Sequence, residues 1–311
     1  QDANGNTVTS SSASITLTIG TNPGGGTLSC TTNPLAASSG VASFAGCSID
    51  KAGTGYTLMA TASGLTSATS STFNITAGTA GKLVFTTQPG GGTAGTAWTQ
   101  QPVVTVQDAN GNTVTSSSAS ITLAIGTNPG GGTLSCTTNP LAASSGVATF
   151  AGCSIDKAGT GYTLTATASG LTSATSSTFN ITAGMAAKLV FATQPGSGMA
   201  GTAWAQQPVV TVQDANGNTV TSSSASITLA VGTNPGGGTL SCTTNPLAAT
   251  SGVATFAGCS VDKAGTGYTL TATASGLTGA TSSTFNITAG AAAKLAFTTQ
   301  PGGGTAGTAW T

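Results

Sequence analysis

The sequence is a tandem repeat, and the length of the repeat limits what the chain can fold into. The octapeptide QDANGNTV begins at Gln1, Gln107 and Gln213, so the period is 107 − 1 = 106 residues. Solenoid repeats of about 20 to 50 residues must stack on one another to bury a core. A unit of 106 residues is instead the size of a whole domain that closes its own core. The repeat therefore predicts a row of similar domains.

Each repeat has the pattern of short β-strands separated by turns. In the second copy, ITLAI places Ile121, Leu123 and Ile125 on one face, and FNIT does the same for Phe179 and Ile181. Such alternation is typical of half-buried strands. The intervening segments GTNPGGG, NPLAASSG and KAGTG have the composition of turns. We therefore predict an all-β fold made of tandem immunoglobulin-like β-sandwich domains, with a small barrel as the alternative.

The charge content excludes several classes of function. Charged residues make up 4% of the chain, against about a quarter in a typical domain. The charged set is six Lys and six Asp, without Arg, Glu or His. General acid–base chemistry depends mostly on His and Glu, and nucleic-acid binding depends on clusters of Lys and Arg. We therefore expect no enzyme, no cofactor and no nucleic-acid partner, and no apolar run reaches the roughly 20 residues of a membrane span.

The repeated DANGN segment superficially resembles a calcium-binding loop. An EF-hand loop needs Gly at its sixth position and a bidentate Glu at its twelfth. In DANGNTVTSSSA the Gly is fourth and the twelfth residue is Ala13. Asn-Gly between two alternating runs is instead a strong hairpin signal, typical of a type I′ turn. We expect a turn and no metal, with weak adventitious calcium binding as the alternative.

Longer segments of the repeat resemble a known family. The run KLVFTTQPGGGTAGTAWTQQPVVTVQDANGNTV, followed by GVATFAGCSIDKAGTGYTL and FNIT, is similar to the bacterial immunoglobulin-like repeats of invasin/intimin-type adhesins and other long surface proteins. The resemblance covers the whole repeat. It implies a sandwich that spaces or builds an extracellular or cell-surface structure, and it implies no catalytic residues.

In this family pattern a domain begins near AGKLVF and ends at FNITAG, which sets the expected boundaries. Complete domains are expected at 79–184 and 185–290, while 1–78 lacks its first strands and 291–311 is an opening strand. Two interpretations fit this offset between the expected domain boundaries and the ends of the sequence. Either the chain is a window of a longer array, or the final strand completes residues 1–78 of the next copy by donor-strand exchange, giving a head-to-tail polymer.

Two cysteines occur in each repeat, 17 positions apart. A fixed, even-numbered pattern in a secreted context predicts disulfides within each repeat; a zinc site or free buried thiols are the alternatives. The predicted pairs are Cys30 with Cys47, Cys136 with Cys153, and Cys242 with Cys259.

Two other residue types recur once per repeat. The sequence NIT makes Asn74, Asn180 and Asn286 candidates for N-glycosylation, because the strand alternation turns each Asn outward; an ordinary surface Asn is the alternative. The tryptophans are expected to pack in the core or at a domain interface, with sugar stacking as the alternative. They are Trp98, Trp204 and Trp310.

Together these features favour a structural repeat protein that forms an extracellular filament or cell-surface stalk. The alternative is an adhesin, a binding module whose repeats contact glycans, cells or surfaces. The expected partners are other copies or further repeats, and glycans.

Overall fold

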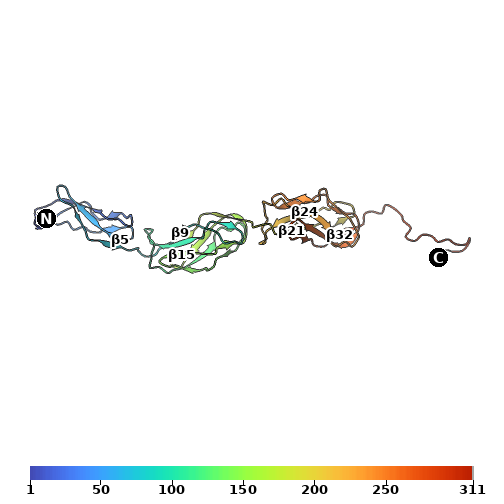
Figure 1. Cartoon of the computed structure of the whole chain (residues 1–311), viewed down its shortest axis with the longest axis horizontal. Helices are drawn as coiled ribbons and strands as arrows, with labels where there is room; N and C mark the ends of the chain where they lie inside the picture. The colour runs from blue at the N-terminus through green and yellow to red at the C-terminus, as the bar shows by residue number, and fades with distance from the viewer. Residues whose placement is uncertain (310–311) are drawn as a thin grey trace. The chain divides into compact units, whose positions relative to one another are not determined.

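The computed structural model describes residues 1–309, and its regular structure there consists of strands without helices. The chain divides into two compact units, Gln1–Thr182 and Ala183–Thr311. The first unit holds two sandwiches, β1 to β8 and β9 to β20, and the second unit holds one, β21 to β32 (Figure 1). The all-β, immunoglobulin-like fold expected from the alternation is confirmed.

One sheet of the second sandwich is built on its central strand β11 (Val103–Gln107). This strand pairs antiparallel with β9 (Lys82–Thr87) on one side and β15 (Val147–Thr149) on the other. The registers Val104↔Phe85 and Val106↔Leu83 place these four apolar side chains in two cross-strand pairs. All four are buried, and Thr105 between the two valines is buried as well, so β11 is covered along most of its length.

The opposite sheet is an antiparallel hairpin, interrupted in the middle and flanked by further strands. Strands β17 (Gly159–Tyr162) and β18 (Leu164–Thr167) pair with β20 (Phe179–Thr182) and β19 (Ala174–Thr175), respectively. The hairpin continues across its break, because the Ser176 amide donates to the Leu164 carbonyl at 2.8 Å. Beside β18 lie β12 (Ser120–Ile125) and then β14 (Leu141–Ala142), while β10 (Gly92–Thr93) runs parallel to β20. The small pair β13 (Leu134–Ser135) and β16 (Ser154–Ile155) completes the sandwich.

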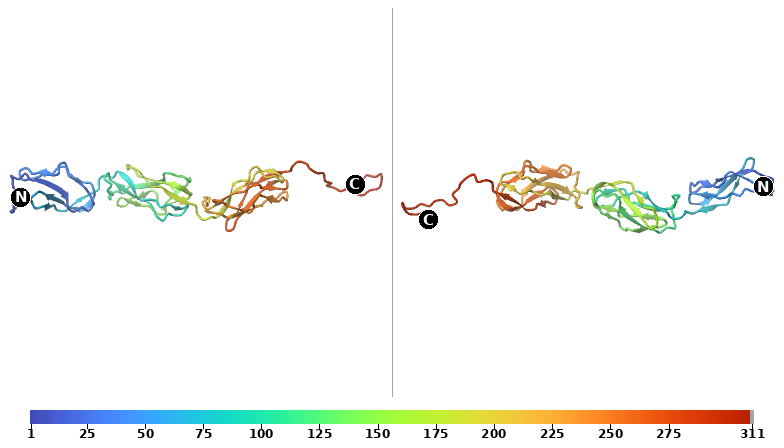
Figure 2. Two further views of the ribbon diagram at one scale, coloured as in Figure 1. Left: turned by 90° about the horizontal axis from the view of Figure 1, so that it is seen from above. Right: turned by 180° about the vertical axis from the view of Figure 1, so that it is seen from behind.

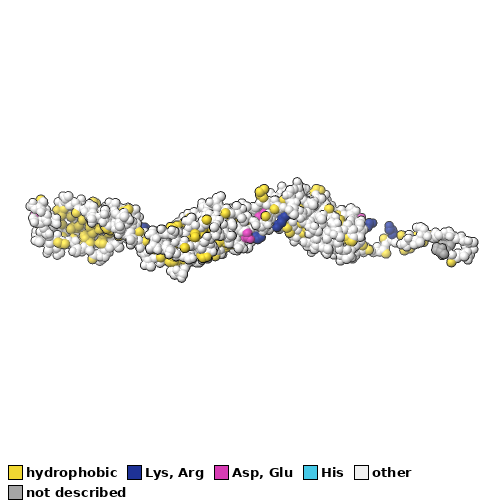
Figure 3. Space-filling model, turned by 60° about the horizontal axis from the view of Figure 1, so that its bottom comes forward, with side chains coloured by type: hydrophobic (Ala, Val, Ile, Leu, Met, Phe, Trp, Pro, Cys, Tyr) yellow, Lys and Arg dark blue, Asp and Glu magenta, His cyan; other side chains and the backbone are white. Residues whose placement is uncertain are grey.

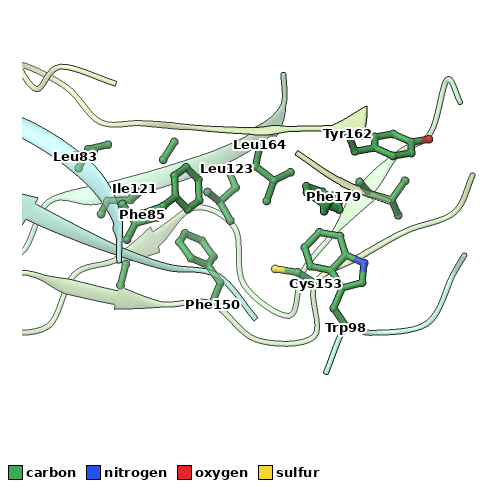
Figure 4. Packing of buried hydrophobic residues seen from close by; sticks show 14 of the residues in the cluster. Leu83, Phe85, Trp98, Ile121, Leu123, Phe150, Cys153, Tyr162, Leu164 and Phe179 are labelled. Atoms are coloured by element: carbon green, nitrogen blue, oxygen red, sulfur yellow. The ribbon is translucent and has the colours of Figure 1, made fainter. Parts of the chain in front are cut away.

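The core of the second sandwich lies between these two sheets (Figure 4). Phe85 and Phe150 come from the first sheet region and face Ile121, Leu123 and Leu164 from the second. Each of these side chains is at most 7% exposed, so each contributes roughly 1.5 to 3 kcal/mol of apolar burial. The period-two pattern read from the sequence therefore corresponds to the inner faces of the sandwich.

The second unit repeats this arrangement one period later. Its sheets have the orders β21-β23-β27, β26-β24-β30-β31, β22-β32-β29 and β25-β28. Two views of the ribbon show the strands (Figure 2). The strands are β21 (Lys188–Thr193), β22 (Gly198–Met199), β23 (Val209–Gln213), β24 (Ser226–Val231), β25 (Leu240–Ser241), β26 (Leu247–Ala248), β27 (Val253–Thr255), β28 (Ser260–Val261), β29 (Gly265–Tyr268), β30 (Leu270–Thr273), β31 (Ala280–Thr281) and β32 (Phe285–Thr288).

The first sandwich contains only part of this framework. Within residues 1–78 there is no counterpart of β9, β10 or β11, and the sheets have the orders β3-β1-β6-β7, β5-β8 and β2-β4. The strands are β1 (Ser14–Ile19), β2 (Leu28–Ser29), β3 (Leu35–Ala36), β4 (Ser48–Ile49), β5 (Gly53–Tyr56), β6 (Leu58–Thr61), β7 (Ala68–Thr69) and β8 (Phe73–Ile75). One inner face of this sandwich is therefore uncovered within the first unit.

Candidate functional site

The DANGN loop follows β11 and forms a turn. The Gly111 amide donates to the Asp108 carbonyl at 3.2 Å, and the Asp108 amide donates to the Asn112 carbonyl at 3.0 Å. The expectation of a type I′ turn is wrong, because that turn needs positive φ at both central residues. In this loop Gly111 has a φ of 82°, whereas Asn110 has no positive φ. Asp at the first position and Gly at the fourth favour a type I turn followed by a left-handed glycine.

The Asp108 carboxylate organises this loop through backbone and side-chain donors. Its Oδ1 accepts from the Asn112 amide at 2.8 Å, and its Oδ2 accepts from Asn112 Nδ2 at 2.9 Å and from the Gly78 amide at 2.8 Å. Burial alone would raise the pKa of Asp108, but these hydrogen bonds outweigh it and lower the pKa to about 2. Both carboxylate oxygens thus have donors from the protein, and in residues 1–309 no three His, Cys, Asp or Glu side chains gather as a metal-binding group.

The six cysteines form three bridges in the structure, each within one repeat. They join Cys30 to Cys47, Cys136 to Cys153, and Cys242 to Cys259. Their surroundings differ, because Cys153 and Cys259 are fully buried whereas Cys47 is exposed. The difference follows from the strands and the tryptophan that cover the bridge in the complete sandwiches.

Trp98 covers the bridge in the second sandwich, and its ring lies against Cys153 and Phe179 (Figure 4). The Trp98 and Phe179 rings meet edge to face with centroids 5.1 Å apart, and Phe179 stacks on Tyr162 at 6.0 Å. Trp98 and Trp204 are each 3% exposed, which favours core packing over sugar stacking. Trp310 lies outside the described residues.

Gln101 is a positioning residue that the sequence pattern did not reveal. Its Nε2 donates to the Trp98 carbonyl at 2.6 Å and to the Cys153 carbonyl at 3.2 Å, and its Oε1 accepts from the Cys153 amide at 2.8 Å. One amide side chain therefore holds the backbone at Trp98 against the backbone at Cys153. The repeated QQPVV sequence was the available signal, but its partner is 52 positions away along the chain.

The candidate glycosylation residues lie on the surface, at a bulge. Asn74, Asn180 and Asn286 are all exposed. The Oδ1 of Asn180 accepts from the Gly161 amide at 2.9 Å, where β17 shifts register against β20. Gly161 has a φ of 87°, which suits glycine. The Asn side chain therefore has a structural role at the bulge, and its use as a glycan acceptor stays a prediction.

The uncovered face of the first sandwich is an apolar hollow. It has a volume of about 190 Å³, and a patch of hydrophobic side chains is visible on the N-terminal sandwich (Figure 3). In the second sandwich the equivalent residues are covered by the segment from β10 to Trp98, which pairs with Ile181 and bonds to the carbonyls of Ile155 and Cys153. The lining residues are Leu28, Cys47, Ser48, Ile49, Leu58, Phe73 and Ile75.

The sequence of β9 recurs after the last sandwich, where it does not form a strand. Residues 289–309 form no strand, and Leu295 and Phe297 are 102% and 78% exposed. The residues at the equivalent positions of β9, Leu83 and Phe85, are 3% and 7% exposed. The apolar side chains of this segment thus have no core in the described part of the chain.

Comparison with known proteins gives structural likenesses. No family model and no curated protein matches the sequence. Among solved structures, the chain is similar to the Escherichia coli adhesin FdeC, with 19% identity, a TM-score of 0.34, and coverage of 94% of this chain and 90% of that one. It is also similar to the Yersinia pseudotuberculosis adhesin InvE, with 18% identity, a TM-score of 0.27, and coverage of 64% and 56%.

A third likeness is to invasin, a bacterial integrin-binding protein, with 14% identity, a TM-score of 0.30, and coverage of 90% of this chain and 53% of that one. The chain thus spans little more than half the length of InvE and invasin. Proteins of other kinds, including a β-glucuronidase, also match in part. Role and partners must therefore be inferred from the residues of this chain.

Proposed function

We propose that this chain is part of an extracellular structural array, a stalk or filament built from tandem immunoglobulin-like sandwiches. The observation that carries the proposal is the short link between the two sandwiches of the first unit, which is hydrogen-bonded to the second sandwich. Strand β8 ends at Ile75 and β9 begins at Lys82, so the link is short. Its Gly78 amide donates to the Asp108 carboxylate, which ties the link to the following sandwich.

The chemistry of the buried groups supports a structural role. Asp108 is 3% exposed, and its hydrogen bonds go to the link and to its own loop. The disulfides support an extracellular or cell-surface location, because such bridges persist in oxidising compartments. Many uncharged Ser and Thr side chains are exposed, and we propose them, with Asn74, Asn180 and Asn286, as acceptors for glycans.

We propose domain boundaries at 79–184 and 185–290 and self-association along the array. Self-association could take two forms, further repeats in one chain or head-to-tail joining of separate copies. Both would lengthen the structure by adding more sandwiches of the same kind. In head-to-tail joining, a segment with the sequence of residues 291–311 would fill the apolar hollow of the first sandwich as an added strand.

Electron microscopy of the natively produced protein tests this role. Sandwiches of about 100 residues standing end to end should give rods with an axial repeat of about 35 to 45 Å. A chain expressed without its disulfides serves as the control for specific assembly. Compact particles, or flexible beads with variable spacing, would reject the stalk or filament.

A further inference from the structure

Four of the seven charged residues of the first unit lie where the first sandwich is followed by the second. From residue 50 to residue 108 the sequence has four, namely Asp50, Lys51, Lys82 and Asp108. Asp50 and Lys51 lie in the turn between β4 and β5 of the first sandwich, which we call the DKAG turn (residues 50–53). Asp108 is the first residue of the DANGN loop (residues 108–112) of the second sandwich, and Lys82 at the start of β9 reaches the same loop. The same four positions are charged one period later, at Asp156, Lys157, Lys188 and Asp214.

Three hydrogen bonds connect the DKAG turn with the DANGN loop. Lys51 Nζ donates to the Asn110 carbonyl at 2.6 Å. Asn112 Oδ1 accepts from the Ala52 amide at 3.0 Å, and Asn112 Nδ2 donates to the Asp50 carbonyl at 3.0 Å. The Asn112 side chain thus uses both its acceptor and its donor on the backbone of the preceding sandwich, a two-point contact that fixes orientation as well as distance.

The DANGN loop holds Asn112 in place for this contact. Asn112 Nδ2 also donates to Asp108 Oδ2 at 2.9 Å, and the Asn112 amide donates to Asp108 Oδ1 at 2.8 Å. Lys82 Nζ reaches the Ala109 carbonyl at 3.5 Å, next to the carbonyl that Lys51 contacts. Asp108 and Lys82 therefore act as positioning residues for a loop whose outer side contacts the neighbouring sandwich.

We infer that the DANGN loop is a docking site whose partner is the DKAG turn of the preceding repeat. The contact restricts the angle between the first and second sandwiches, with Asn112 and Lys51 as the residues that determine it. The sequence repeats both halves unchanged, QDANGN at 1, 107 and 213 and DKAG at 50, 156 and 262. The inference rests on the proposed structural role and adds the recognition element that would make such an array stiff.

The first copy of the loop provides a matched control. In it the Asn6 amide and Nδ2 donate to Asp2 Oδ1 and Oδ2 at 2.8 and 2.9 Å, the same bonds that Asn112 makes to Asp108. Asn6→Ala therefore removes the internal bond from Asn6 Nδ2 to Asp2 Oδ2, while the bond from the backbone amide to Oδ1 remains. Asn112→Ala removes the equivalent Nδ2 bond to Asp108 and also the two bonds to Ala52 and Asp50, so the difference between the two variants isolates the contribution of Asn112 to docking.

The experiment measures the distance between the two sandwiches in the 311-residue chain by pulsed electron spin resonance. Spin labels are attached by cysteine-free chemistry at Thr66 and Thr122, which are exposed on the first and second sandwich. We expect a narrow distance distribution in the parent and in Asn6→Ala. We expect a distribution at least about twice as wide in Asn112→Ala and an intermediate width in Lys51→Ala.

Hydrogen exchange at the Ala52 amide is the local readout. Its exchange should accelerate at least about tenfold in Asn112→Ala and stay unchanged in Asn6→Ala, because only the first change removes its acceptor. Unchanged distance widths in Asn112→Ala and Lys51→Ala would overturn the docking site, as would equal broadening in Asn6→Ala. Regular rods in micrographs alongside unchanged widths would retain the proposed function while rejecting this inference.

Discussion

Removal of the disulfide in the second sandwich gives a sharp test of how the complete repeats are stabilised. The double substitution Cys136→Ala/Cys153→Ala opens a loop closed by residues 17 positions apart. In the chain-entropy model a loop of this length contributes about 3 kcal/mol to the free energy of unfolding. Cys153 is fully buried beside Trp98, so loss of its sulfur adds a cavity cost of about 1 kcal/mol.

The expected total of about 4 kcal/mol converts to a lower melting midpoint. For a domain of about 100 residues each kcal/mol corresponds to about 4 °C, which predicts a decrease of roughly 16 °C. The chain has three tryptophans, so replacing Trp204 and Trp310 by Phe leaves Trp98 as the fluorescence reporter of the second sandwich. Thermal melts of parent and variant in this background measure the shift.

The matched control is Cys30→Ala/Cys47→Ala in the first sandwich. It opens a loop of the same length, but Cys47 is exposed and the Trp98 transition should stay where it is. A Trp98 midpoint lowered by less than about 4 °C in the first variant would refute the reasoning, because the entropic part alone exceeds that. Six free thiols in native mass spectrometry would remove its basis altogether.

The other predictions concern the DANGN loop and the apolar hollow. The pKa of Asp108 is lowered in the folded state to about 2, from an ordinary value of 3.8, so its stabilising contribution is complete above pH 3.8 and is lost as the pH falls through about 2. The Trp98 melting midpoint should therefore fall more steeply between pH 4 and 2 in the parent than in Asp108→Asn, and equal slopes would contradict the assignment. Chelation of calcium should leave the midpoint unchanged, because protein donors occupy the carboxylate; a decrease of several degrees that added calcium reverses would reveal a bound cation. Prolonged incubation at mildly alkaline pH should deamidate Asn110, whose exposed side chain is followed by a Gly without a side chain, while Asn128 before Pro stays intact; peptide mapping that finds equal loss at both would contradict this prediction. A synthetic peptide with the sequence of residues 79–106 should protect amides of residues 1–78 from hydrogen exchange by filling the hollow, and a peptide with scrambled order is the control; equal protection by both would argue against strand addition.

Local sequence alone determined the class of fold and much of the site. Alternation at Ile121, Leu123 and Ile125 predicted β12, because side chains on a strand alternate between faces whatever the strand pairs with. The same reasoning assigned DANGN to a turn, since Asp, Asn and Gly favour turn conformations through short-range interactions. It did not give the turn type, because hydrogen bonds to the Asp108 side chain select the type I geometry over type I′.

Tertiary structure decided which of the repeated segments become strands. Residues 147–149 form β15 against β11, whereas the nearly identical residues 41–43 form no strand, because their partner strand is absent from residues 1–78. KLVFTT forms β9 at residues 82–87, while the similar KLAFTT at residues 294–299 is exposed. A strand needs backbone partners and a surface that covers its apolar face, and neither is encoded within its own few residues. For the same reason the docking role of Asn112 could be seen only once the fold placed residues 60 positions apart in contact.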